Sequence, residues 1–260
     1  MLYPRIIPCL LVKNKGLVKT RKFKDPKYIG DPINTVKIFN EKEVDELVVL
    51  DIEASKNNIN PDYNMIKNLA VECRMPLCYG GGIKTAEQAN KIFSLGVEKI
   101  ALNSGAIASP SIITEISKNV GSQSVVVVLD VRKKLFSKNY EIWVDSHSTN
   151  TKINPIEVID KIKDLGVGEI VINSIDNDGM MNGYDLEFIA KVKEKTNLPL
   201  TALGGAGSID DIKKLISHYG TIGCGVGSLF VFNGKYRAVL VTYPSIEEKE
   251  EIIKSSQIKE

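Results

Sequence analysis

The chain has 260 residues, of which 43% are hydrophobic and 25% charged, enough to bury a large core and too apolar for a disordered chain. Its 34 basic and 32 acidic residues leave a net charge of +2, which gives no electrostatic footprint for nucleic acid. No apolar run approaches the ~18 residues of a membrane span, and the N-terminal apolar run is too short for a signal peptide. We therefore expect a cytoplasmic protein without a nucleic-acid or membrane partner.

Short β-branched runs alternate with amphipathic stretches along the chain. The expected strands cover residues 5–12, 46–52, 76–80, 99–102, 124–131, 169–175, 199–204 and 221–227. Expected helices between them include 31–44, 85–96, 154–166 and 208–220, and Thr85 with Gln88 has the spacing of a capping box. Eight nearly continuous apolar strands separated by helices predict an α/β fold with parallel strands, and the count favours a closed (β/α)8 TIM barrel over an open sheet.

The two halves of the chain resemble each other. CYGGGI at 78–83 is echoed by ALGGAG at 202–207, so Gly81 and Gly205 are 124 residues apart, and Ser104 and Ser228 have the same separation. These matching segments occur in the same order in both halves. They predict half-barrels at about 1–120 and 121–232 within one domain of residues 1–260. A C-terminal helical tail is expected at 245–260.

The cysteines and histidines indicate neither a metal site nor a nucleophilic catalytic site. The cysteines lack metal-site spacing and lie in or beside apolar runs, which predicts buried reduced thiols at Cys9, Cys73, Cys78 and Cys224. His147 and His218 provide neither a zinc cluster nor a Ser-His-Asp set, and His218 stands late in an expected helix, as a surface residue would. We expect neither a metal nor a cofactor.

Glycines and hydroxyl residues follow four of the expected strands. Residues 80–82 and 204–205 follow the third and seventh strands, and residues 103–104 and 227–228 follow the fourth and eighth. Bare backbone amides can approach phosphate oxygens closely. This pattern therefore predicts two repeat-related sites that bind the phosphates of a phosphorylated small molecule. The alternative is that the glycines only form tight turns.

Carboxylates also stand where strands are expected to end. Asp130 closes an otherwise apolar strand, which suits a general acid or base. The alternative for Asp130 is a structural acid paired with Arg132, Lys133 or Lys19. The two aspartates of SIDNDG at 174–179 are either site residues or turn formers.

Several motifs resemble HisF, the cyclase subunit of imidazole glycerol phosphate synthase. They span about residues 1–232 and are RIIPCLLVK, VVLDIEAS, YGGGI, GSQSVVVVLD, GVGEIVINSIDNDGMMNGYD, and LGGAG followed by GSLF. The resemblance implies a TIM barrel partnered by a HisH-like glutaminase, with ammonia travelling through the barrel to the far mouth.

The resemblance also implies site residues. The family's phosphate-binding positions fall here on Gly82, Asn103, Ser104, Asp178, Gly179, Gly205, Gly227 and Ser228. Its ring of charged gate residues at the N-terminal mouth falls on Arg5, Glu46, Lys99 and Glu169. The alternative for these four is an ordinary set of salt bridges at the bottom of a barrel.

One catalytic position departs from the family. The cyclase needs aspartates at the ends of strands one and five; Asp130 keeps the second, and Leu11 replaces the first. Losing one acid/base partner typically costs about 10²–10⁴-fold in rate. A degraded cyclase is the alternative to a changed function. Further departures are Thr20 in place of glycine, Glu53 in place of a small hydroxyl residue, and Met180-Met181 in place of Thr-Lys.

A subgroup of HisF-like proteins is more similar. The WbuZ-type proteins of surface-polysaccharide clusters resemble this chain in CLLVK and in the tail GSLFVFNGKYRAVLVTYPS. That resemblance implies a barrel that, with its glutaminase, supplies ammonia to an N-acetyl-sugar amidotransferase. We therefore predict a non-cyclising, ammonia-conducting subunit. The alternatives are a working cyclase of histidine biosynthesis, with Glu53 as the substitute acid, and a structural scaffold for the glutaminase.

Overall fold

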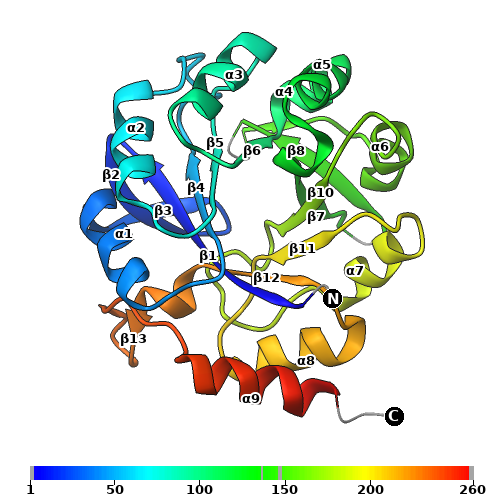
Figure 1. Ribbon diagram of the computed structural model, residues 1–260. Coiled ribbons are helices and arrows are strands. Elements are labelled where there is room, and N and C mark those ends of the chain that lie inside the picture. Colours follow the sequence, from blue (N-terminus) through cyan, green and yellow to red (C-terminus); the bar gives the residue numbers. More distant parts are fainter. Residues whose placement is uncertain (1–2, 136, 146–147, 258–260) are drawn as a thin grey trace.

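Eight parallel strands close into a barrel in the computed structural model, which describes residues 3–135, 137–145 and 148–257 (Figure 1). The spatial order runs β10-β11-β12-β1-β4-β5-β6-β7, and pairing of β7 with β10 closes the sheet. The strands are β1 (Arg5–Lys13), β4 (Leu47–Asp51), β5 (Leu77–Gly80), β6 (Lys99–Leu102), β7 (Val125–Lys133), β10 (Glu169–Ser174), β11 (Leu200–Leu203) and β12 (Gly223–Val226). Each predicted strand is confirmed, and so is the TIM barrel.

Helices surround the barrel and cover its outer face (Figure 1). They are α1 (Pro32–Glu41), α2 (Tyr63–Glu72), α3 (Ala86–Ser94), α4 (Ser104–Ala108), α5 (Ser111–Val120), α6 (Pro155–Ile162), α7 (Leu186–Lys193), α8 (Ile209–Tyr219) and α9 (Ile246–Gln257). The predicted capping box is confirmed at α3, where Thr85 and Gln88 each accept a bond from the other's backbone N–H.

The apolar side chains form two clusters. The larger lies between the strands and the helices, and the smaller fills the barrel interior, where Ile7, Val48 and Val171 meet. The free thiols of Cys9, Cys78 and Cys224 are buried as predicted. Cys73 is free but only half-buried, because it lies at the end of α2 rather than within a strand; the prediction of burial is wrong there.

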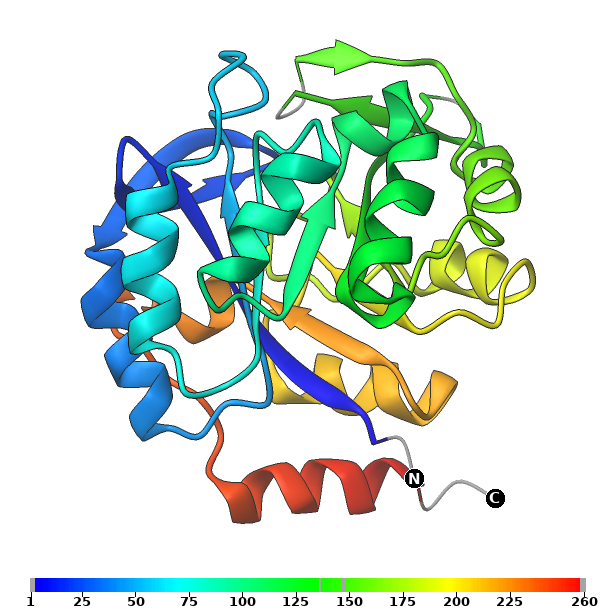
Figure 2. The same ribbon diagram turned by 45° about the horizontal axis from the view of Figure 1, so that its top comes forward.

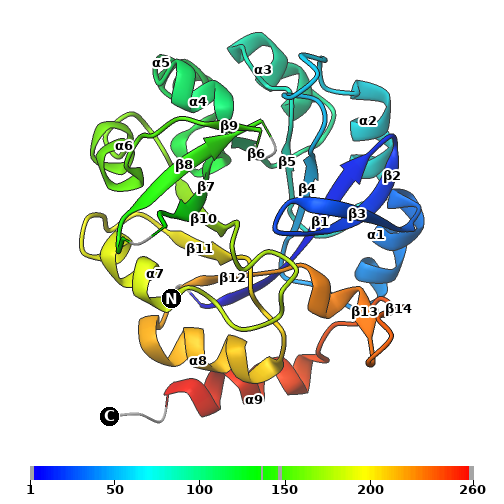
Figure 3. The ribbon, with the colours of Figure 1, turned by 180° about the vertical axis from the view of Figure 1, so that it is seen from behind.

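Three antiparallel hairpins stand at one mouth of the barrel (Figure 3). β2 (Gly16–Arg21) pairs with the C-terminal end of β1 and with β3 (Lys24–Gly30). β8 (Tyr140–Val144) pairs with the C-terminal half of β7 and with β9 (Thr149–Asn150). β13 (Phe232–Asn233) and β14 (Ala238–Val239) follow β12. None of these hairpins was predicted from the sequence.

The tail after β12 fastens itself to the opposite, N-terminal end of the strands. The hydroxyl of Tyr243 donates to the carbonyl of Ile6, 2.8 Å away, and the ammonium of Lys249 lies 2.7 Å from the carboxylate of Asp45. The helix α9 packs beside α8 on the outside of the barrel (Figure 2). The expected C-terminal helix is thus present. Among the described helices, none is long and apolar enough to cross a membrane.

Candidate functional site

A pocket opens at the C-terminal ends of the barrel strands and encloses about 1200 Å³, part of it open to solvent. Its lining includes both catalytic positions considered above, Leu11 and Asp130. The structure also brings together at this pocket all the predicted phosphate residues, which are Gly82, Asn103, Ser104, Asp178, Gly179, Gly205, Gly227 and Ser228. Residues from the first to the last barrel strand therefore converge on one space, as expected of a TIM-barrel active site.

The two halves of this mouth have matching backbone geometry. Gly81 and Gly205, which correspond in the repeat, have φ of +123° and +113°. Asn103 and Gly227, which also correspond, have φ/ψ of −126°/−97° and −102°/−91°. A Cβ at Gly205 would lie 2.0 Å from the carbonyl oxygen of Gly183, so the turn itself requires glycine. The geometry supports the predicted half-barrel repeat, and phosphate binding stays a prediction.

Asp178 holds the β2–β3 hairpin over the mouth. Its carboxylate accepts hydrogen bonds from the hydroxyl of Thr20 at 2.6 Å and from the backbone N–H of Phe23 at 3.0 Å. A Cβ at Gly179 would lie 2.1 Å from the carbonyl oxygen of Thr20, so the two segments touch. Burial raises the pKa of Asp178, and the hydrogen bonds from Thr20 and Phe23 oppose that shift. Asp178 therefore ties the hairpin to the loop after β10, and its part in phosphate binding stays a prediction.

The neighbouring aspartate of SIDNDG faces a different partner. Asp176 lies 3.3 Å from the guanidinium of Arg132 and accepts a 3.0 Å bond from the backbone N–H of Lys133. It therefore ties the end of β7 to the loop after β10 and does not line the pocket.

Asp130 is buried and held by two amide side chains. Nδ2 of Asn173 donates to its Oδ1 at 2.8 Å, and Nδ2 of Asn103 donates to its Oδ2 at 3.0 Å. Burial raises the pKa of Asp130 to about 7, although both hydrogen bonds act against the shift. The described contacts of its carboxylate are amides, whereas Lys19 donates to the carbonyl of Cys9. A carboxyl poised near neutral pH favours proton transfer over a structural ion pair.

The raised pKa makes stability depend on pH. Between the ordinary value of 3.8 and about 7, the folded state keeps a proton on Asp130 that the unfolded state has released. Raising the pH through this window should therefore lower the free energy of unfolding, by up to about 4 kcal/mol from this group. The Asp130→Asn variant cannot titrate and should lose that component.

Denaturant titrations of wild type and D130N at about pH 5 and about pH 8 measure this contribution of Asp130 to the free energy of unfolding. The stability of wild type relative to D130N should fall between the two pH values. Parallel pH dependence in the two proteins would contradict a shifted Asp130. Asp51, whose pKa burial also raises, is present in both proteins and cancels in this comparison.

Lys19 is a pocket residue that was not predicted from the sequence. This fully buried lysine of β2 lines the pocket, and its ammonium donates to the carbonyl oxygen of Cys9. Burial lowers its pKa, and the nearby carboxylate of Asp178 opposes that shift. Nothing in the basic stretch LVKTRKFK distinguishes Lys19 from its neighbours until the hairpin folds its side chain inward.

Glu53 is turned away from the pocket. Its carboxylate lies 3.5 Å from the ammonium of Lys13 and accepts a bond from the backbone N–H of Asn14. Asp51, at the end of β4, lines the pocket instead, although one of its oxygens accepts the backbone N–H groups of Glu53 and Ala54. Glu53 is therefore a poor substitute for the acid that Leu11 replaces.

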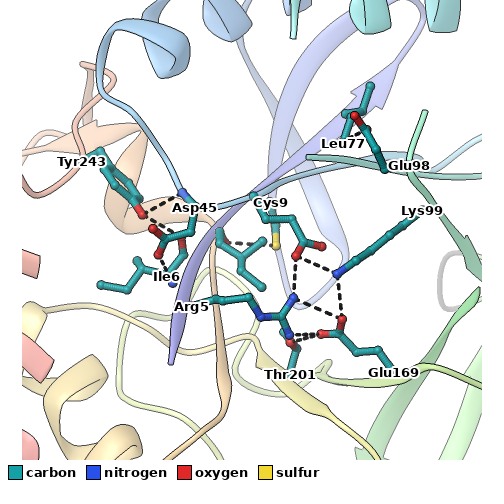
Figure 4. A network of polar contacts seen from close by, with 12 residues as sticks. Arg5, Ile6, Cys9, Asp45, Leu77, Glu98, Lys99, Glu169, Thr201 and Tyr243 are labelled. Atoms are coloured by element: carbon teal, nitrogen blue, oxygen red, sulfur yellow. Dashed lines mark hydrogen bonds and ion pairs between the residues drawn. The ribbon is translucent and has the colours of Figure 1, made fainter. Parts of the chain in front are cut away.

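At the N-terminal mouth, four charged side chains form a ring. Arg5 lies 2.5 Å from Glu46 and 2.7 Å from Glu169, and Lys99 lies 2.8 Å and 3.1 Å from the same carboxylates. Figure 4 shows Arg5, Lys99 and Glu169 pointing toward one another. Burial alone would raise the pKa of Glu169, but the hydrogen bond and charge of Arg5 and the charge of Lys99 together lower it. The structure brings together all four predicted gate residues.

A narrow cavity begins directly above this ring. Glu46, Glu169 and Thr201 line its lower end, and its walls are the apolar side chains of the barrel interior. Five residues line both this cavity and the pocket at the far mouth: Cys9, Leu50, Ala101, Val128 and Leu203. The interior cavity and the pocket at the far mouth are therefore neighbours that share these five side chains.

Within the described residues, no group of three or more His, Cys, Asp or Glu side chains could hold a metal ion. His218 is exposed in the last turn of α8, with its Nδ1 2.8 Å from the carbonyl of Lys214, in agreement with the predicted surface role. His147 lies outside the described residues.

Comparison with known proteins gives consistent matches. A family model described as "Histidine biosynthesis protein" matches residues 5–237. A protein of Vibrio vulnificus, provisionally named an imidazole glycerol phosphate synthase subunit, is 53% identical over 253 residues, which cover 97% of both chains. A similarly named protein of Leptospira interrogans is 52% identical over 96% of this chain and 98% of its own. An imidazole glycerol phosphate synthase subunit HisF of Alkaliphilus metalliredigens is 37% identical over 81% of this chain and 83% of its own.

Proposed function

This chain belongs to the HisF family of histidine-biosynthesis proteins, and on that premise we propose that it is an ammonia-conducting barrel subunit that does not cyclise. The observation that carries the proposal is Leu11, which lines the pocket where the family has an aspartate, opposite an Asp130 that is kept and buried. Leucine cannot carry a proton, so one of two acid/base partners is missing.

The ring and the cavity support ammonia conduction. Ammonia from a HisH-like glutaminase would enter between Arg5, Glu46, Lys99 and Glu169 and follow the apolar interior to the far mouth. Apolar walls suit the small neutral molecule better than they suit ammonium, because burying a charge without a partner is costly. A barrel that served only as a scaffold would need neither the ring nor the pocket.

The acceptor of the ammonia is inferred from the tail. The resemblance of the tail GSLFVFNGKYRAVLVTYPS to WbuZ-type proteins supports an N-acetyl-sugar amidotransferase of surface-polysaccharide biosynthesis as the third component. The pocket at the far mouth would then hold a phosphorylated small molecule.

A second candidate is a working cyclase of histidine biosynthesis. The raised pKa of Asp130, about 7, favours it, because such a carboxyl can donate or accept a proton near neutral pH. Asp51 is the carboxylate in the pocket that could act beside Asp130, since Glu53 faces Lys13.

The two candidates are separated by turnover of the cyclase's bis-phosphorylated ribulosyl substrate with ammonium salt added directly, so that no glutaminase is needed. We expect turnover at least about 10²-fold below that of an ordinary HisF assayed in parallel, because one acid/base partner is missing. Circular dichroism establishes that the protein assayed is folded. Turnover at the level of the ordinary HisF would return the chain to histidine biosynthesis and contradict the proposal.

A further inference from the structure

The tail hairpin carries an arginine to the rim of the mouth. Arg237 immediately precedes β14, and its guanidinium contacts two different loops of the pocket. Nη1 donates to the carbonyl oxygen of Gly179 at 3.2 Å, and Nη2 donates to the hydroxyl of Ser228 at 3.3 Å. These two partners are predicted phosphate residues, one after β10 and the other after β12. The guanidinium thus bridges one half of the mouth.

The surrounding side chains hold Arg237 in this position. Its guanidinium lies 4.5 Å from the centre of the Phe232 ring, across the hairpin. Lys27, on β3, donates to the carbonyl oxygen of Arg237 at 3.1 Å, and its ammonium lies 5.1 Å from the centre of the same ring. The hairpins β2–β3 and β13–β14 are therefore fastened to each other at the mouth.

The backbone of Arg237 is strained for a residue with a side chain. Its φ is +51°, in the left-handed region that side chains disfavour and that glycine or asparagine would occupy more readily. Strained backbone persists where surrounding contacts hold it, and such positions cluster at sites with a function. In the hairpin, the unfavourable backbone conformation of Arg237 places its guanidinium against Gly179 and Ser228.

Positive charge gathers on this half of the mouth. A Cβ placed on Gly227 would lie 3.1 Å from the ammonium of buried Lys19. Burial lowers the pKa of Arg237, and the positive charge of nearby Arg21 lowers it further, while the negative charge of Asp178 opposes both effects. Three cations therefore act here against the carboxylate of Asp178, which is already bonded to Thr20 and to the N–H of Phe23. A dianion would restore the balance.

We propose that Arg237 binds the ligand directly and that, with Gly179, Gly227 and Ser228, it grips a phosphomonoester dianion. This inference rests on the proposed function, because it names how the phosphorylated small molecule is recognised at one end. The guanidinium presents a planar fork of donors that matches two phosphate oxygens. Its present bonds of 3.2 and 3.3 Å are long, so exchanging them for charge-assisted bonds to phosphate is favourable.

The two half-sites then differ in selectivity. Gly179 and Ser228 each accept a hydrogen bond from Arg237, whereas in the described part of the chain no hydrogen bond joins Gly82, Asn103 or Ser104 to an arginine. The end of the ligand at Ser228 must therefore be a dianionic phosphate, whereas the end at Ser104 meets backbone amides and a hydroxyl. The arginine-bearing half binds a dianion more strongly than a monoanion of the same shape.

Binding of inorganic phosphate to the full chain, followed by ³¹P NMR titration, tests the inference. Wild type should bind phosphate, and Arg237→Ala should weaken binding by about 10-fold or more, as expected for a lost hydrogen-bonding charge. Arg237→Lys keeps the charge without the fork and should give intermediate affinity. Lys235→Ala, an exposed cation of the same hairpin, is the matched control and should bind within about twofold of wild type.

The outcomes separate this inference from the proposed function. Equal phosphate affinity in wild type, R237A and R237K would overturn the role of Arg237. The proposal that the pocket holds a phosphorylated small molecule would still stand. Absence of phosphate binding to folded wild type would overturn both. Circular dichroism and thermal unfolding establish that each variant is folded, and if R237A fails to fold, the comparison of R237K with K235A decides.

Discussion

Replacing Leu11 with aspartate is expected to raise ammonia-dependent turnover of the bis-phosphorylated ribulosyl substrate by about 10²-fold or more over wild type. The position already lines the pocket that contains Asp130. It is paired with Leu50 on β4 and with Val18 on β2, so the strand that carries it is fixed on both sides. The new carboxylate would need no movement of the backbone to face the substrate.

The electrostatics of the mouth suit a second carboxylate. Lys19 donates to the carbonyl of Cys9, two residues before Leu11, and its ammonium would favour the ionised form of an aspartate there. Asp130, with its pKa near 7, can hold a proton at the same pH. Two carboxyl groups whose environments separate their pKa values can act as a base and an acid in one reaction.

Leu11→Asn is the matched control, because asparagine has the shape of aspartate but cannot exchange a proton at this pH. Steady-state rates with ammonium salt are compared for wild type, L11D and L11N, with circular dichroism to establish folding. Equal rates in L11D and L11N would mean that the missing carboxylate does not limit cyclisation. The other departures of this mouth, among them Thr20 on the hairpin, would then have to account for the loss.

The barrel is readable in the sequence because its strands are buried on both faces. A run such as VVVVL at 125–129 is apolar throughout, which indicates a parallel strand beneath helices, and the structure has β7 there. The hairpins at the mouth lack this signal. KDPKYIG of β3 is mostly exposed and contains a proline, so neither alternation nor composition marks it as a strand.

Two cations at the mouth, one lining the pocket and one at its rim, were missed because the hairpins that carry them were missed. Lys19 lies on β2 and Arg237 beside β14, and in both cases a hairpin turns one cation of a basic stretch toward the mouth. The choice of that cation is made by tertiary packing, such as the contact of Arg237 with Phe232, and not by local pattern. The glycines and Asp130 could be predicted because they end strands whose direction the fold class already determines.

Replacing Glu169 with glutamine is expected to lower the free energy of unfolding by about 3 kcal/mol, the lower end for a broken buried ion pair because its partners are partly exposed. Glu169 is only 5% exposed; one of its oxygens accepts from Arg5 and Thr201, and the other accepts from Arg5 and Lys99. A glutamine would point its amide N–H groups at one of these donors. Arg5 and Lys99 would then share Glu46, and the ring would carry an excess positive charge.

Replacing Glu169 with glutamine should also uncouple glutamine hydrolysis from amidation of the acceptor. On the proposed function, the wild-type assembly with its glutaminase and amidotransferase should yield about one ammonia at the far mouth for each glutamine hydrolysed, because Glu46 and Glu169 of the ring line the interior cavity. In E169Q the ring at the entrance carries an excess positive charge, so the amount of glutamate released per amidated product should rise. That ratio should fall again when ammonium salt is supplied. Both products are measured in the same reaction.

Glu187→Gln supplies the control for loss of a carboxylate alone. Glu187 also lies close to two lysines, at 3.0 Å from Lys191 and 3.4 Å from Lys133, but it is half-exposed on α7 and far from the ring in the fold. Exposed ion pairs contribute little, so this variant should keep wild-type stability and coupling. An E169Q variant that is destabilised and yet couples like wild type would make the ring a structural clasp, because its charge balance would then matter to the fold and not to the passage of ammonia.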